Sequence, residues 1–114
     1  MSLFNKKHDF ERQRKETYET FSTIQDKVTL PEKANIDFHF KAREIFPRFE
    51  ECAMRLKLLG FEVSAYGRTL QATMKNSEVN VENIWSLEMA ASQIALNFKF
   101  KPDGWGMGGP KSPN

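Results

Sequence analysis

The feature that most restricts the fold of this chain is a repeated order of hydrophobic patterns, in which an alternating segment is followed by a helical one and then by another alternating one. Residues 36–41 alternate, with Ile36, Phe38 and Phe40 on one face. A period of two indicates a strand with one buried face. Apolar residues then recur at steps of three and four over 43–59, which indicates a helix packed on the core.

The predicted helix over 43–59 has signals at both ends. Pro47 is tolerated in the first turn, where the backbone N–H has no intrahelical acceptor. Gly60 follows the last apolar residue and supplies the C-terminal stop. The expected core-facing stripe consists of Ile45, Phe49, Cys52, Leu56 and Leu59.

A second unit of the same kind follows. Residues 61–66 and 69–75 alternate on either side of the turn at Gly67–Arg68, and a polar loop over 76–80 ends in Asn80, a candidate cap for the next helix. That helix is predicted over about 81–97, and a last strand begins at Phe98 and runs to Lys101. Two strand–helix–strand units joined by a hairpin predict an α+β fold of the ferredoxin-like split βαβ type, a βαββαβ antiparallel sheet with its helices on one face.

An extra helix is predicted before this domain, over 9–28, with Asp9 as its cap. Its apolar stripe is thin, so we expect it to pack loosely on the domain or against a partner. The expected division is a flexible N-terminus (1–8), this helix, a linker (29–35) containing Pro31, the ferredoxin-like domain (36–106) and a flexible tail (107–114). The stripe consists of Phe10, Tyr18, Phe21, Ile24 and Val28.

Composition excludes several classes of protein. The chain has 114 residues, which favours one domain, and a net charge of only +2, which gives no case for a dedicated nucleic-acid binder. One cysteine and two histidines rule out an internal disulfide and make a metal site improbable. No apolar run reaches the ~20 residues of a membrane helix and no signal peptide is seen. We expect a soluble cytoplasmic protein with no cofactor and no membrane partner.

Residues that could perform catalysis are few. His39 lies on the polar face of its strand, without a candidate nucleophile beside it. Cys52 falls in a core-facing stripe, where a buried and inert thiol is expected. Glu50 and Glu51 diverge around a helix and form no carboxylate pair. We therefore expect no enzymatic activity.

The polar face of the predicted sheet is the first candidate binding surface. Four lysines, which could meet an acidic partner, project from it: Lys41, Lys75, Lys99 and Lys101. An RNA-recognition sheet stacks bases on outward aromatic rings, whereas Phe38 and Phe40 share the core face with Ile36. Binding of single-stranded RNA on this face remains the alternative function.

The second candidate is the segment Asp103-Gly104-Trp105-Gly106, expected directly after the last strand. Its glycines permit positive φ and close backbone approach, and the indole offers a large apolar face. Trp105 could cover the end of the core or anchor a protein interface, where Trp is over-represented. Trp85, just off the apolar stripe of the last helix, could pair with it or form a second anchor.

Two segments resemble sequences of the family of the regulator of ribonuclease E activity B. Members of this family are small bacterial proteins with a ferredoxin-like fold. The two segments are Leu59-Gly60-Phe61-Glu62-Val63, at a helix-to-strand junction, and Asp103-Gly104-Trp105-Gly106. The resemblance covers roughly residues 36–106. It implies a non-enzymatic protein that binds the non-catalytic region of ribonuclease E and so modulates RNA turnover. The mixed-charge N-terminal helix and Pro102 depart from the family pattern, and a paralogue with another partner is an alternative. The oligomeric state stays open, with a dimer as one option.

Overall fold

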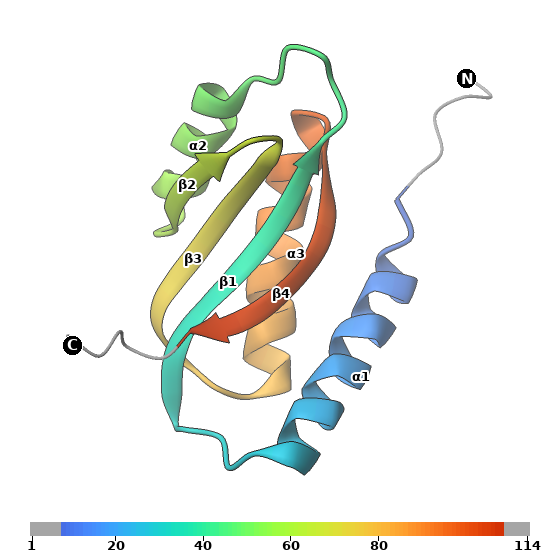
Figure 1. Ribbon diagram of the computed structural model, residues 1–114, viewed down its shortest axis with the longest axis vertical. Helices are drawn as coiled ribbons and strands as arrows, with labels where there is room; N and C mark the ends of the chain where they lie inside the picture. The colour runs from blue at the N-terminus through green and yellow to red at the C-terminus, as the bar shows by residue number, and fades with distance from the viewer. Residues whose placement is uncertain (1–7, 109–114) are drawn as a thin grey trace.

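The structure is a computed structural model that describes residues 8–108, and these form an α+β arrangement of three helices and one four-stranded antiparallel sheet (Figure 1). All neighbouring strands are antiparallel, in the order β2-β3-β1-β4. The predicted α+β class is confirmed. The elements are α1 (Phe10–Lys27), β1 (Lys33–Ala42), α2 (Phe49–Leu58), β2 (Glu62–Tyr66), β3 (Thr69–Glu78), α3 (Val81–Asn97) and β4 (Phe100–Gly108).

The core lies between the sheet and the helices α2 and α3, which cover one of its faces (Figure 1). Ile36, Phe38 and Phe40 on the central strand β1 are at most 1% exposed, as their alternation predicted. Full burial of side chains of this size stabilises a fold by about 1.5–3 kcal/mol each. The opposite face of the sheet carries the polar side chains, and the three helices leave it uncovered (Figure 1).

The second helix begins later than the sequence predicted. α2 starts at Phe49, whereas a helix from about Arg43 with Ile45 in its core stripe was expected, and Ile45 is 82% exposed. The cause is Pro47, whose ring disfavours helical backbone in the residue before it. Cys52 and Leu56 are buried as predicted. Leu59, also assigned to the stripe, is half exposed because the helix has ended there.

The last strand is the largest departure from the sequence prediction. β4 runs from Phe100 to Gly108, so the segment Asp103–Gly106 lies inside a strand instead of after one. Met107 and Gly108, expected in a flexible tail, also belong to β4, and residues 109–114 lie outside the described range. The predicted start at Phe98 is wrong, because Phe98 caps the C-terminus of α3 and Lys99 follows with φ of +66°.

Other boundaries shift in the same direction, toward longer strands. β3 continues through Glu78, although residues 76–80 were expected to be a loop. β1 begins at Lys33, inside the predicted linker. Asn80 does cap α3, since its side chain accepts a hydrogen bond of 2.7 Å from the Asn83 backbone N–H. The strands gain length because both ends of β1 find pairing partners in β3 and β4.

The first helix packs along α3, beside β4 and away from the centre of the sheet (Figure 1). Asp9 caps it as predicted, accepting from the Arg12 backbone N–H at 3.0 Å. The thin apolar stripe is only partly used: Phe21 is buried, whereas Val28 is 55% exposed. Two polar residues, Gln13 and Thr17, occupy the rest of the buried face.

Candidate binding surfaces

The open face of the sheet carries a continuous hydrogen-bonded network. Gln71 lies at its centre, where its amide nitrogen lies 3.4 Å from Asp37 Oδ1 and its amide oxygen contacts His39 Nε2 at 3.2 Å and the Tyr66 hydroxyl at 3.3 Å. Thr73 donates to Asp37 at 2.5 Å. These side chains satisfy one another, and within residues 8–108 the hydrogen-bond partner of His39 is an amide and not a nucleophile. The network is suited to holding the face in shape and to presenting polar groups.

The four lysines predicted on this face do not form one patch. Lys75 on β3 pairs with Glu62 at 3.4 Å, with both side chains more than half exposed. Lys41 and Lys101 lie directly opposite each other on β1 and β4. Lys99 is not part of the sheet and follows the end of α3. The structure therefore brings Lys41 and Lys101 together, whereas Lys75 lies apart from them in an ion pair with Glu62.

A β-bulge determines where the Asp103–Gly106 segment points. β4 has one residue more than β1 between the pairs Phe40↔Pro102 and Phe38↔Trp105. Gly104 sits in this bulge with φ of +100°, a conformation that glycine adopts without strain. Because Phe38 faces the core, the bulge turns Trp105 toward the same side.

Trp105 packs against the edge of the hydrophobic core and is partly buried. Its indole N–H is buried and makes no hydrogen bond within the described residues. This placement favours the core-covering role, while the interface-anchor role remains a prediction. Trp85 is half-buried on α3. The aromatic contacts between residues 8 and 108 include no Trp85–Trp105 pair.

The interface between α1 and α3 contains a buried polar cluster that the sequence did not reveal. The Gln13 amide donates to Glu88 at 2.9 Å and to the Ser92 hydroxyl at 3.0 Å, and the Thr17 hydroxyl also donates to Glu88. Glu88 is 3% exposed, and burial raises its pKa above the ordinary value. The sequence feature that could have indicated this cluster is Glu88 itself, a glutamate on the apolar face of α3 four residues after Ile84.

Exposed apolar side chains form a second feature missed by the sequence. Ile45 and Phe46, in the loop between β1 and α2, are 82% and 87% exposed. Met54 and Leu58 stand one turn apart on the outer face of α2 at 65% and 78%. The prediction of a single continuous helix concealed the first pair, since it assigned Ile45 to the core.

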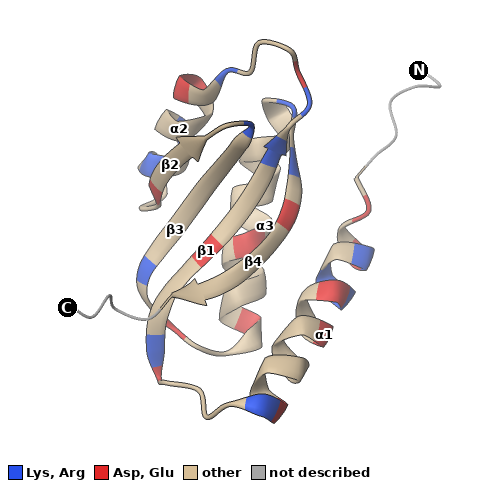
Figure 2. Cartoon of the chain, in the orientation of Figure 1, with Lys and Arg blue, Asp and Glu red and all other residues tan. Residues whose placement is uncertain are grey.

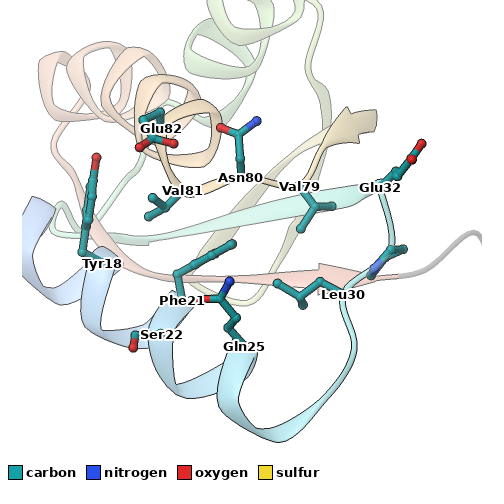
Figure 3. A pocket seen from close by; sticks show the side chains of 11 residues that line it. Tyr18, Phe21, Ser22, Gln25, Leu30, Glu32, Val79, Asn80, Val81 and Glu82 are labelled. Atoms are coloured by element: carbon teal, nitrogen blue, oxygen red, sulfur yellow. The ribbon is translucent and has the colours of Figure 1, made fainter.

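A shallow apolar groove of about 640 Å³ lies where the C-terminal half of α1 meets the loop before α3 (Figure 3). Phe21 and Leu30 form part of its wall, and Val79 and Val81 face them. The polar groups around it, such as Tyr18 and Glu82, do not converge on a common point (Figure 3). The groove results from incomplete packing of α1 on the domain. Its polar side chains are not placed to orient a polar ligand.

Residues suited to metal or thiol chemistry are not assembled. Within residues 8–108, no group of three or more His, Cys, Asp or Glu side chains could hold a metal ion. Cys52 is fully buried as predicted, and burial raises the pKa of its thiol to about 11, which disfavours the reactive thiolate. No helix in the described part of the chain is long and apolar enough to cross a membrane.

No family model matches the chain, and no curated protein matches it.

Proposed function

We propose that this chain is a non-enzymatic, protein-binding regulator built on a ferredoxin-like domain, and that its partner is a ribonuclease E-type enzyme whose RNA turnover it modulates. The resemblance of residues 59–63 and 103–106 to the regulator of ribonuclease E activity B family supports this partner. The ferredoxin-like assignment is supported by the element order from β1 to β4 and by the strand order β2-β3-β1-β4.

The observation that carries protein binding is the outer face of α2. Met54 and Leu58 lie on one side of the helix, 65% and 78% exposed, and Leu59 follows at 51%. Neighbouring large apolar side chains left in water mark interaction sites more often than isolated ones do. A partner that covered both side chains would gain roughly 1.5–3 kcal/mol from each, before the costs of association.

The Asp103–Gly106 segment contributes to this proposal indirectly. Trp105 packs on the core from β4, at the opposite edge of the sheet from β2, against which α2 packs. We therefore assign the direct partner contact to α2, and assign Trp105 a structural role. A direct contact by Trp105 or Trp85 is the competing version, and the two versions make different predictions for substitutions.

The test uses purified protein and the purified non-catalytic region of a ribonuclease E-type enzyme, with binding measured by calorimetry. Met54→Ser with Leu58→Ser should weaken binding at least tenfold, whereas Val28→Ser, at another exposed apolar site, should leave it unchanged. If Trp105→Ala abolishes binding in a protein that remains folded by circular dichroism, the contact belongs to Trp105. Absence of any binding by the wild-type protein would reject the nuclease as partner.

Single-stranded RNA binding remains the second candidate because of one residue. Tyr66 is 55% exposed and is hydrogen-bonded to the open-face network through Gln71, so it offers one ring for stacking. This function predicts oligonucleotide binding that weakens with salt and is lost on substitution of Lys41, Lys75, Lys99 and Lys101. Lack of an anisotropy change with a labelled oligouridylate at low salt would exclude it.

A further inference from the structure

The loop between β1 and α2 projects from one end of the molecule's long axis, which measures 46 Å (Figure 1). At its apex are Ile45 and Phe46, the two most exposed large hydrophobic side chains between residues 8 and 108. Neither side chain covers the core, because both are more than four-fifths exposed. Exposure of two consecutive large apolar side chains to water is unfavourable unless a nonpolar environment outside the chain takes them up.

Hydrogen bonds attach the base of this loop to Arg68 and Lys99, so the exposure of the apex does not come from an unattached segment. The Arg68 guanidinium donates to the carbonyls of Ala42 at 2.9 Å and Glu44 at 2.7 Å. The Arg43 backbone N–H donates to the Lys99 carbonyl at 2.9 Å. On the other side, the Arg48 guanidinium lies 5.0 Å from the centre of the Phe98 ring. The structure thus holds the apex outward from a fixed base.

Basic residues of several elements lie around this base, and one acidic residue, Glu44, lies in the loop directly before Ile45 (Figure 2). Lys41 on β1 faces Lys101 on β4 directly, an arrangement of like charges that disfavours folding. The ion pairs found within residues 8–108 leave both lysines unpaired. We name this end the basic tip; it consists of the loop apex Ile45–Phe46 and the surrounding Lys41, Arg43, Arg68, Lys99 and Lys101.

We propose that the basic tip docks on an anionic lipid bilayer, with Ile45 and Phe46 entering the boundary between headgroups and acyl chains. The cations then lie over anionic headgroups, which relieve the repulsion between Lys41 and Lys101. A bilayer takes up a projecting apolar loop without needing a complementary pocket. Its anionic headgroups lie at the surface and its acyl chains beneath them, which matches cations at the base of the loop and apolar side chains at its apex. An acidic protein surface would satisfy the cations, but it would need a preformed pocket for both apolar side chains.

The sequence predicts the opposite, that no membrane partner exists, because its apolar runs are too short to span a bilayer and peripheral docking leaves no such run. Its helical periodicity also placed Ile45 in the core. The exposure of Ile45 depends on the late start of α2, which only the structure reveals. Peripheral docking is independent of the proposed nuclease binding, because that contact uses the outer face of α2.

The experiment measures co-sedimentation of the full chain with vesicles of phosphatidylcholine alone or of phosphatidylcholine mixed with phosphatidylglycerol. Binding is expected only to the mixed vesicles and should weaken as salt is raised. Each Lys or Arg near an anionic surface adds about 1 kcal/mol, so Lys41→Gln with Lys101→Gln should lower the partition coefficient about thirtyfold. Ile45→Ser with Phe46→Ser should lower it at least tenfold.

Met54→Ser with Leu58→Ser is the matched control, since it also removes two exposed apolar side chains and should leave vesicle binding unchanged. Vesicles with brominated acyl chains should quench the tryptophan of a Phe46→Trp variant more than they quench the wild type. The proposal is overturned if mixed vesicles fail to bind the protein at low salt, or if the Ile45 and Phe46 substitutions have no effect. Binding of oligouridylate or of polyglutamate through the same lysines, with none to vesicles, would also overturn it.

Discussion

Replacing Gly104 by alanine tests whether the bulge in β4 requires a residue with positive φ. A Cβ atom added at Gly104 would have no atom within 4 Å, so any destabilisation must come from the backbone. Gly106 is the matched control because a Cβ there is equally free of contacts and its φ is not positive. The two variants add the same methyl group to the same strand, two residues apart.

The magnitude follows from two terms. Replacement of glycine by alanine restricts the unfolded chain and stabilises by about 0.4–1 kcal/mol when the native backbone suits alanine, a gain that both variants share. Only Gly104→Ala is strained, by about 1–2 kcal/mol for a non-glycine residue in the left-handed region. The difference in free energy of unfolding between the variants should therefore be about 1–2 kcal/mol. At about 4 °C per kcal/mol, Gly104→Ala should melt about 4–8 °C below Gly106→Ala.

Urea unfolding followed by far-ultraviolet circular dichroism measures this difference, provided the slope of the transition is unchanged. Equal midpoints for the two variants would refute the reasoning, because the shared entropy term cancels. Deletion of Gly104 extends the test. Without the extra residue, Asp103 would pair with His39 and Trp105 would still pair with Phe38 on the core side. The emission of Trp105 in a Trp85→Phe background should therefore stay unchanged, and a shift to longer wavelength would contradict the assignment of Gly104 as the extra residue.

Two further predictions concern the C-terminal end of α3 and its buried carboxyl group. Lys99 has φ of +66° after the helix, so Lys99→Gly should raise the free energy of unfolding by about 0.5–1 kcal/mol, and a lower urea midpoint would contradict this. Burial raises the pKa of Glu88, so the folded state holds this proton more tightly than the unfolded state does. The protonated carboxyl group therefore contributes its full stabilisation below the ordinary pKa of 4.5. That contribution is lost as the pH rises through the pKa of the folded state. The urea midpoint of the wild type should therefore fall relative to that of Glu88→Gln as pH is raised above 4.5, and a constant difference would contradict the assignment.

The parts of the fold that the sequence predicted are those governed by local chemistry. The alternation of Ile36, Phe38 and Phe40 depends only on which side of a strand is buried, and the structure buries all three. Asp9 and Asn80 each cap a helix through a hydrogen bond made within three residues. Gly60 ends α2 with φ of +101°, as a glycine after a helix is expected to do.

The missed features depend on competition between local signals or on distant contacts. Helical periodicity placed Ile45 in the core, but the restriction that Pro47 imposes on Phe46 prevails and leaves Ile45 in water. The buried pair of Thr17 and Glu88 involves residues 71 positions apart, and neither position alone marks a polar contact. As a result, both candidate docking features, the basic tip and the outer face of α2, became visible only with the structure.

The bulges explain why counting along β4 would have put Trp105 on the wrong face. Phe100 and Pro102 lie opposite Ala42 and Phe40, which face the core, so strict alternation would turn Trp105 outward. The extra residue at Gly104 reverses this. β3 repeats the device on the other side of β1, where Asn76 has φ of +54° and its backbone N–H donates to the Asn35 side chain at 3.0 Å. A bulge is defined by the partner strand, so Asp103-Gly104 can indicate a turn or a bulge, and only pairing with β1 decides between them.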